Sequence, residues 1–332
     1  MIKVFQYLAV ILLLVLVVLA FARSQNALYK PYRRIKLGDH PLWEFLAVDE
    51  MRRHLFVSHQ LKLLVIHIDT DETVAALDFP RAVYGIALAL PLNKGFVSHR
   101  SENAVSVFDL QTLQIIGRIE GAGAQPENLL YDAHSNRLFT CNSKGRSLTV
   151  IDPVLQTVLT TIPLPGQPAL AACDGQGNLF VSLSNSDALL QIDTSTCQLV
   201  KHWTPYPGEP PGGLAFDSDN NLLFCVYDGQ MIVAEAATHT QLAIVPVGNH
   251  PGAVVYDPAT SLIYVANGEG NVTILKQGQP DEYKVIQKLS TQTNCRSMVL
   301  DPLTKKIYLP ALQYQSARKP LPNSFELLVF GL

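Results

Sequence analysis

The sequence predicts an all-β protein, a seven-bladed β-propeller of four-stranded antiparallel blades, from three repeating features. An apolar run ends in Asp in six of seven units, as at Asp49, and the second unit has Leu90 there instead. An apolar pair such as Ile307-Tyr308 follows, and then a run such as "VIHID" (65–69). Each feature recurs seven times at a spacing of 40–44 residues, and short β-branched and aromatic runs broken by turn residues predict strands.

The first element is an apolar segment that stands apart from the repeats. "VFQYLAVILLLVLVVLAFA" (4–22) carries no charge and has the length of a signal-peptide core or a short transmembrane helix. We therefore assign residues 1–30 to an N-terminal apolar helix, as signal peptide or membrane anchor, plus a linker. Ala20-Phe21-Ala22 fits a cleavage site, and we expect export to the periplasm or cell surface, with a membrane anchor through 4–22 if uncleaved. Uncleaved, the basic residues after this segment would instead favour a cytoplasmic propeller.

The next element is the propeller, which the repeats place at 31–332. The last unit ends with its third strand, "FELLVF" (325–330), and only two residues follow. Its outer strand must come from elsewhere, and "RRIKLG" (33–38) is the nearest donor. We predict that this strand near 33–38 closes the ring and removes its free edges.

Two recurring residue types have a structural explanation. Asp109 with Thr112, and Asp193 with Thr196, place a short acceptor at the start of a tight turn. The five cysteines form no CxxC motif, and three of them, at positions 141, 173 and 225, lie in apolar strand-like runs. We expect these three to be buried thiols.

Three phrases carry a resemblance to a known family: "IYVANGEGNVTIL" (263–275), "LFTCNSKGRSLTVID" (138–152) and "FVSHRSENAVSVFD" (96–109). They resemble the YVTN-repeat β-propeller family, whose phrase is Tyr-Val-Thr-Asn, a turn, then Val-Ser-Val-Ile-Asp. The resemblance implies the propeller fold and an exported bacterial protein, and it implies no specific activity. The sequence departs from the pattern at Leu90, Glu235 and Lys276.

Candidate site residues follow from the repeat register, because propeller ligands usually lie where the inner strands begin. Counting back five residues from each marker gives Glu44, Glu127 and Arg296 as charged positions, with Gly or Ala in the other four units. We expect the small residues to leave the mouth of the channel open, and Glu44 to pair with Arg296 across the closure. Histidines and arginines of blades six, seven, one and two would form a sector around the mouth, either as solvated turn residues or as ligands for an anion or a metal. The predicted ligand-binding set is Glu44, Tyr84, Glu127, Asn128, Arg296, His59, His99 and His250.

Composition and missing motifs limit the function. The net charge is −3 with no basic block beyond the N-terminal region, which argues against nucleic acid as partner. The sequence contains no HExxH, GxSxG, Walker or CxxCH motif, so it identifies no catalytic residue, and we predict no cofactor or metal. We expect a non-catalytic recognition or scaffold propeller of the cell envelope that binds a protein partner or a small anionic ligand at the channel mouth. The alternative is a metal-assisted hydrolase of the lactonase type, with Glu44 or Glu127 as metal ligand or general base.

Overall fold

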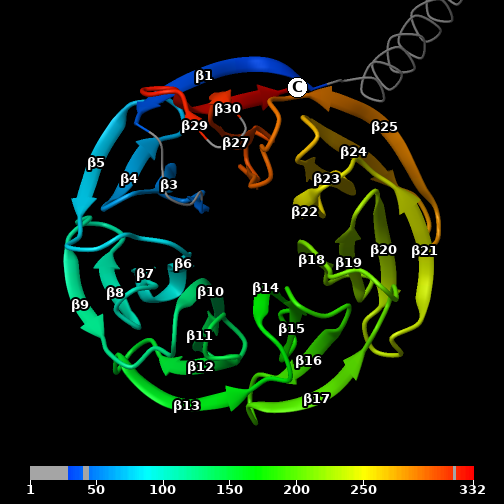
Figure 1. Ribbon diagram of the computed structural model, residues 1–332, viewed down its shortest axis with the longest axis horizontal. Helices are drawn as coiled ribbons and strands as arrows, with labels where there is room; N and C mark the ends of the chain where they lie inside the picture. Colours follow the sequence, from blue (N-terminus) through cyan, green and yellow to red (C-terminus); the bar gives the residue numbers. More distant parts are fainter. Residues whose placement is uncertain (1–28, 40–44, 317–318) are drawn as a thin grey trace, which may run out of the picture.

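Seven four-stranded antiparallel sheets are arranged as blades around a central axis, as predicted (Figure 1). The computed structural model describes residues 29–39, 45–316 and 319–332. The predicted apolar helix, signal peptide or anchor falls on residues 1–28, which lie outside the described part. Within that part, no helix is long and apolar enough to cross a membrane.

Blades one to six each use four consecutive strands, from the inner to the outer position. The strands of blades one to three are β2 (Leu46–Asp49), β3 (His54–His59), β4 (Lys62–His67) and β5 (Thr73–Asp78); β6 (Ile86–Ala89), β7 (Lys94–His99), β8 (Ala104–Asp109) and β9 (Ile115–Ile119), with the 3-10 helix η1 (Leu90–Leu92) after β6; and β10 (Pro126–Asp132), β11 (Arg137–Asn142), β12 (Ser147–Asp152) and β13 (Thr157–Pro163). Those of blades four to six are β14 (Pro168–Cys173), β15 (Asn178–Leu183), β16 (Leu189–Asp193) and β17 (Gln198–Trp203); β18 (Leu214–Asp217), β19 (Leu222–Tyr227), β20 (Gln230–Glu235) and β21 (Gln241–Pro246); and β22 (Pro251–Asp257), β23 (Leu262–Asn267), β24 (Asn271–Gln277) and β25 (Tyr283–Ser290).

Blade seven is built from both ends of the described chain, and this confirms the predicted closure. Its order is β26 (Val299–Leu300), β27 (Ile307–Ala311), β30 (Phe325–Gly331) and β1 (Lys30–Gly38). The closing strand is longer than the predicted 33–38, and it runs antiparallel to β30 with Ile35 opposite Leu327. A separate hairpin of β28 (Tyr314–Ser316) and β29 (Lys319–Pro320) lies between β27 and β30 in the sequence.

The core lies between neighbouring blades, and the recurring apolar pair supplies its largest side chains. The aromatic member is fully buried in every blade, at Phe56, Phe96, Phe139, Phe180, Phe224, Tyr264 and Tyr308. Burying one such side chain stabilises the folded state by roughly 1.5–3 kcal/mol, so the repeat supplies each blade with one large buried side chain.

The recurring aspartates start turns, as predicted, and some also link blades. Asp109 Oδ1 accepts hydrogen bonds from the backbone N–H groups of Gln111 and Thr112, at 2.8 and 2.7 Å. At the ring closure, Asp301 of blade seven accepts two hydrogen bonds from Arg53 of blade one, at 2.9 and 2.7 Å. The ring is therefore joined across its closure by buried charges as well as by the β1–β30 pairing.

The small residues at the start of the inner strands also have a role that was not expected. The N–H of Gly85 donates to the carbonyl of Glu127 in the next blade at 2.9 Å. A Cβ atom at Gly85 would lie 2.2 Å from that carbonyl oxygen, and one at Gly252 would lie 2.3 Å from the carbonyl oxygen of Arg296. These glycines let neighbouring inner strands approach each other, and three of the four small residues, Ala169, Gly212 and Gly252, also line a cavity, which agrees with the expected open mouth.

All five cysteines are free thiols. Cys141 and Cys225 are buried as expected, whereas Cys173 is partly exposed. Burial raises the pKa of the Cys141 and Cys225 thiols to about 12, which keeps both protonated at neutral pH.

Candidate ligand-binding site at the mouth of the channel

A cavity of about 470 Å³ lies where blades four to seven present their inner strands and entry loops. We call it the axial cavity; it is lined by residues 169–170, 209–212, 226–228 and 250–252 with Ser184 and Arg296. Its walls come from the start of β14, the loop into blade five, the β19–β20 turn, the start of β22 and the loop into blade seven. The structure thus brings two predicted residues, His250 and Arg296, to one cavity.

The backbone around these two residues is fixed by contacts between blades. His250 has a left-handed φ of 54°, and its N–H donates to the Asp228 carboxylate. The carbonyl of Arg296 accepts the N–H of Ala253 at 2.6 Å, and its guanidinium donates to the Pro251 carbonyl at 3.3 Å. The Arg296 stem passes close over Gly268, where a Cβ would lie 3.2 Å from it.

Tyr227 supplies a buried polar group to the axial cavity. The residue is 1% exposed, and its ring packs against Tyr206 with the centroids 5.4 Å apart. Its hydroxyl interacts with the Cys225 thiol and has no oxygen or nitrogen partner among the residues that the structure describes. Burial, followed by the neighbouring Cys225, raises the pKa of this hydroxyl far above its usual value, so it remains a neutral group. A thiol is a weak hydrogen-bond partner, so a carbonyl oxygen of a ligand would satisfy this hydroxyl better than Cys225 does.

The charges around the axial cavity are of both signs. Arg296 brings a cation, Asp228 and Glu209 bring carboxylates, and His250 Nδ1 lies 3.5 Å from Asp228 Oδ1. The His250 and Asp228 side chains are 70% and 48% exposed, so both are accessible from solvent. The lining is therefore suited to a ligand that itself carries opposite charges, rather than to a simple anion.

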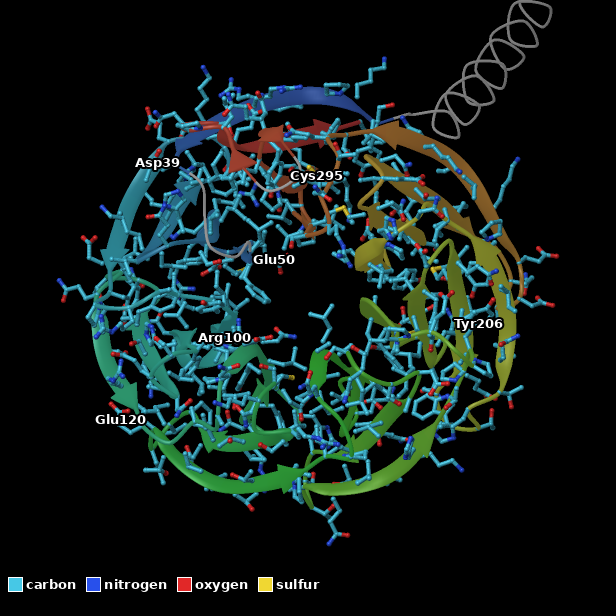
Figure 2. The ribbon with its side chains drawn as sticks, viewed as in Figure 1. Asp39, Glu50, Arg100, Glu120, Tyr206 and Cys295 are labelled. Carbon is cyan, nitrogen blue, oxygen red and sulfur yellow. The ribbon has the colours of Figure 1, made fainter. Side chains whose placement is uncertain are left out.

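A second pair of predicted residues, Tyr84 and Glu127, meets around an arginine at blades two and three. Arg100 Nε lies 2.8 Å from Glu127 Oε1, and the Ser143 hydroxyl donates to the same oxygen at 2.9 Å. The Arg100 guanidinium also lies 6.0 Å from the centroid of the Tyr84 ring. Figure 2 shows Arg100 on the inner side of its blade. The Glu127 carboxylate is thus held by a cation and a hydroxyl.

The remaining predicted residues do not join either group. His99 is fully buried, with Nε2 2.8 Å from Ser106 Oγ and Nδ1 3.3 Å from the Ala82 carbonyl. The His99 ring packs against Phe79 with the centroids 5.2 Å apart, and in this buried position it lines neither the axial cavity nor the Arg100 group. His59 stacks on Phe325 with the centroids 5.4 Å apart, and its Nε2 lies 2.7 Å from the Asp39 carbonyl.

Asn128 and Glu44 complete the predicted set. Asn128 is a partly buried residue of β10, paired in register with Cys141. Glu44 and its predicted pairing with Arg296 lie outside the described residues. Among the described residues, no three His, Cys, Asp or Glu side chains are grouped so that they could hold a metal ion.

Sequence reasoning missed three residues of the axial cavity: Tyr227, Asp228 and Glu209. Tyr227 and Asp228 occupy the β19–β20 turn, the same turn that made us select His59 in blade one. Applying that choice to all blades would have found them. Glu209 lies in "PYPGEPPGG" (205–213), a proline-rich entry loop without a counterpart in the other units.

Comparisons with known proteins support the fold and leave the family open. No family model and no curated protein matches the chain. A chain of "Kuenenia stuttgartiensis Hydrazine Synthase" is similar with a TM-score of 0.71 and 17% identity, covering 82% of this chain and 92% of that one. A chain of "Crystal Structure of Mitotic Checkpoint Complex" is similar with a TM-score of 0.77 and 13% identity, covering 91% of this chain and 92% of that one. The chain of "Structure of U3-55K" is similar with a TM-score of 0.74 and 11% identity, covering 91% of this chain and 100% of that one. At these identities the comparisons show a β-propeller fold alone, and the YVTN-repeat family stays a resemblance.

Proposed function

We propose that this chain is a non-catalytic recognition propeller whose axial cavity binds an extended segment of a protein partner. The segment would carry charges of both signs, with a carboxylate against Arg296 and a cation against Asp228 and Glu209. The propeller fold is consistent with a scaffold or binding role, and the name of one similar structure describes a complex for its own protein. The observation that carries the proposal is the axial cavity itself, with its mixed charges and the weakly satisfied Tyr227 hydroxyl.

A protein segment fits these features better than a small anion. An anion would meet Arg296 together with two carboxylates, and their repulsion would offset much of the attraction. A peptide offers carbonyl groups that can accept from Tyr227, and side chains that can match each charge around the rim. The cavity volume of about 470 Å³ accommodates a few residues of such a segment.

The location forms part of the same proposal and rests on the sequence. The apolar stretch 4–22 supports export to the cell envelope, with membrane attachment if the stretch is retained. Fractionation of cells that express the full chain, with mass spectrometry of its N-terminus, tests this part. A cytosolic chain with an intact, unattached N-terminus would contradict it.

The binding proposal is tested with a library of short peptides that differ in the order of acidic and basic residues, using anisotropy with the full chain. We expect peptides with both charges to bind best, and Arg296→Gln to weaken binding by about 10- to 100-fold, since a hydrogen bond to a charged group contributes roughly 1.5–3 kcal/mol. Tyr227→Phe should weaken the same peptides by a smaller factor. Lys201→Gln, on β17 of blade four, is the control of equal charge change. If no peptide responds to Arg296→Gln, the proposed site is wrong.

A further inference from the structure

The outer strands of blades six and seven carry an unusual concentration of positive charge. β1 reads KPYRRIKLG and β25 reads YKVIQKLS, so the two strands hold six cationic side chains and no acidic one. The outer strands of blades three and five, β13 and β21, contain no charged residue at all. In a chain of net charge −3, this is a local positive sector on the rim, which we call the basic rim.

The basic rim is a continuous surface because its two strands are tied together. The backbone N–H of Tyr29 donates to Gln287 Oε1 at 2.8 Å, and Gln287 Nε2 donates to the Tyr29 carbonyl at 2.8 Å. Figure 1 shows β1 and β25 meeting at the edge of the ring. Tyr29 is 3% exposed, so the chain is anchored here before β1 begins.

Part of this charge is already neutralised, and part is free to act on a partner. Arg33 pairs with Asp71, and Arg34 pairs with Glu326 at 2.8 Å. The lysines at positions 30, 36, 284 and 288 are exposed, and none has an ion-pair partner among the described residues. Asp281 and Glu282 precede Lys284, and the Glu269 carboxylate is close enough to Lys288 to interact with its charge, so the positive field is centred nearer Lys30 and Lys36.

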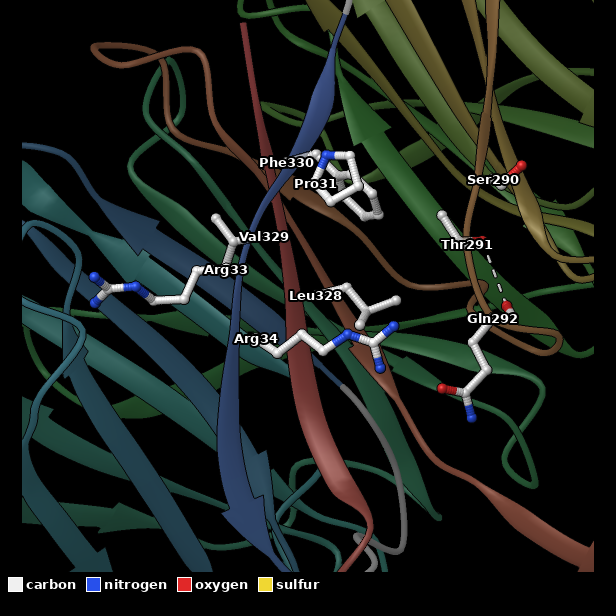
Figure 3. A pocket seen from close by; sticks show the side chains of 9 residues that line it. All are labelled: Pro31, Arg33, Arg34, Ser290, Thr291, Gln292, Leu328, Val329 and Phe330. Atoms are coloured by element: carbon white, nitrogen blue, oxygen red, sulfur yellow. Dashed lines mark hydrogen bonds between the residues drawn. The ribbon is translucent and has the colours of Figure 1, made fainter.

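A cavity of about 380 Å³ opens between the two strands of the basic rim. Figure 3 shows Arg34 projecting across Leu328 toward Gln292, while Arg33 projects to the opposite side. Leu328 and Phe330 give the cavity an apolar floor, and residues 290–292 form its far wall. Tyr32, next to the cavity lining, is 56% exposed with Lys306 3.8 Å from its ring centroid. Exposed aromatic and cationic side chains together are typical of surfaces at the membrane interface.

We propose that the basic rim docks on an anionic lipid bilayer, with lipid phosphates contacting the exposed lysines Lys30, Lys36 and Lys288. Three observations favour a bilayer over other polyanions. The charges lie on a convex outer edge, the cavity has an apolar floor, and the apolar stretch 4–22 ends seven residues before Tyr29. Basic residues close to a membrane-inserting segment gain from the negative surface potential of anionic lipids. This surface is separate from the axial cavity, so the inference rests on the membrane attachment in the proposed function but not on the proposed binding site.

The test uses the full chain with vesicles of phosphatidylcholine alone and with about one-third phosphatidylserine. Flotation reports attachment, and acetylation of lysines followed by mass spectrometry reports which side chains are covered. We expect slower labelling of Lys30, Lys36 and Lys288 only with the anionic vesicles. Lys201, on β17, should be labelled equally with both. Raising the salt from about 0.1 M to about 1 M should remove the difference, because the Debye length falls from about 10 Å to about 3 Å.

Charge-matched variants make the test specific. The double variant Lys30→Gln with Lys288→Gln should reduce the protection of Lys36 from acetylation. Each lysine removed should lower the affinity for anionic vesicles about fivefold. The control pair, Lys144→Gln with Lys201→Gln, removes the same charge elsewhere on the ring and should leave the protection unchanged.

Three outcomes would overturn the proposal. The first is equal labelling with both vesicles, whether or not the chain floats. The second is equal protection by inorganic phosphate alone, which would make the basic rim a site for a soluble anion. The third is stronger protection by a single-stranded oligonucleotide than by anionic vesicles, which would assign the basic rim to nucleic acid.

Discussion

Replacing Arg53 by Met should weaken the ring closure, because it removes the cation that holds Asp301. Arg53 lies in the β2–β3 turn of blade one and reaches Asp301 of blade seven through two parallel hydrogen bonds, at 2.9 and 2.7 Å. The Asp301 side chain is fully buried, and that of Arg53 is 16% exposed. Met keeps the apolar stem of the side chain, so the variant mainly tests the loss of the charge.

The magnitude follows from the pKa of Asp301. Burial opposes its ionisation, but hydrogen bonds from Arg53 and then Thr304 outweigh burial and lower the pKa from 3.8 to about 2. At about 1.36 kcal/mol per unit, this depression stabilises the folded state by about 2.4 kcal/mol at pH 7. Removing one partner of a buried ion pair costs roughly 3–5 kcal/mol, since the other charge stays buried. We expect Arg53→Met to lower the free energy of unfolding by about 3 kcal/mol.

The same pair predicts a pH dependence with a definite sign. Because the folded-state pKa of Asp301 is depressed, its contribution is complete above the unfolded pKa of 3.8 and is lost as the pH falls toward about 2. About half of the stability that Asp301 contributes at neutral pH remains at pH ~3. The difference between wild type and Arg53→Met should therefore shrink between neutral pH and pH ~3.

Denaturant unfolding followed by circular dichroism, at neutral pH and at pH ~3, measures both effects. Lys62→Met is the matched control, because Lys62 pairs with Asp78 at 3.4 Å where both side chains are about half or more exposed. Such exposed pairs contribute roughly 0–1 kcal/mol. The reasoning is refuted if Arg53→Met behaves like Lys62→Met, or if its deficit is the same at both pH values.

Three further predictions concern the core, the inner strands and metal content. Phe180→Ala should lower the free energy of unfolding by about 3–5 kcal/mol in the same denaturant assay, because it empties a fully buried site; a loss below about 1 kcal/mol would contradict this packing. Gly85→Ala should cost roughly 1–3 kcal/mol, since its Cβ would lie 2.2 Å from the Glu127 carbonyl oxygen, whereas Gly331→Ala, with no atom nearer than 3.6 Å, should be close to neutral. Metal analysis of the purified full chain should give substoichiometric values, and one equivalent of zinc would revive the hydrolase alternative.

The blades and their closure could be predicted because their causes are local in the sequence. Each blade contains one apolar pair within a strand-like run, and the aromatic member of each pair is buried. The missing outer strand of blade seven left one donor, and β1 supplies it. Turn aspartates such as Asp109 bond to their own neighbours, so they too were visible in the sequence.

The candidate site could be predicted only in part, because residues distant in the sequence determine whether each candidate side chain is buried or exposed. His59 and His99 occupy the same place in nearly identical phrases, yet Phe79 covers His99 while His59 stacks on Phe325. Nothing in the phrase "FVSH" distinguishes the two environments. The role of Gly85 was also hidden, since only the position of the next blade shows how closely Glu127 approaches.

The two proposed surfaces lie at opposite ends of the blade sheets, and this determines how they influence each other. The axial cavity is built where inner strands begin, whereas the basic rim is built on outer strands β1 and β25. Four strands at about 4.8 Å spacing separate the inner and outer edges of a blade by about 14 Å, beyond the Debye length at physiological salt. Cross-links such as Arg53 to Asp301 hold the ring as one closed body, so no hinge between blades is needed for binding at either place. Charge changes at Arg296 should therefore leave the lipid footprint of Lys288 unaltered, and a partner bound in the axial cavity would be presented at a fixed orientation to the bilayer.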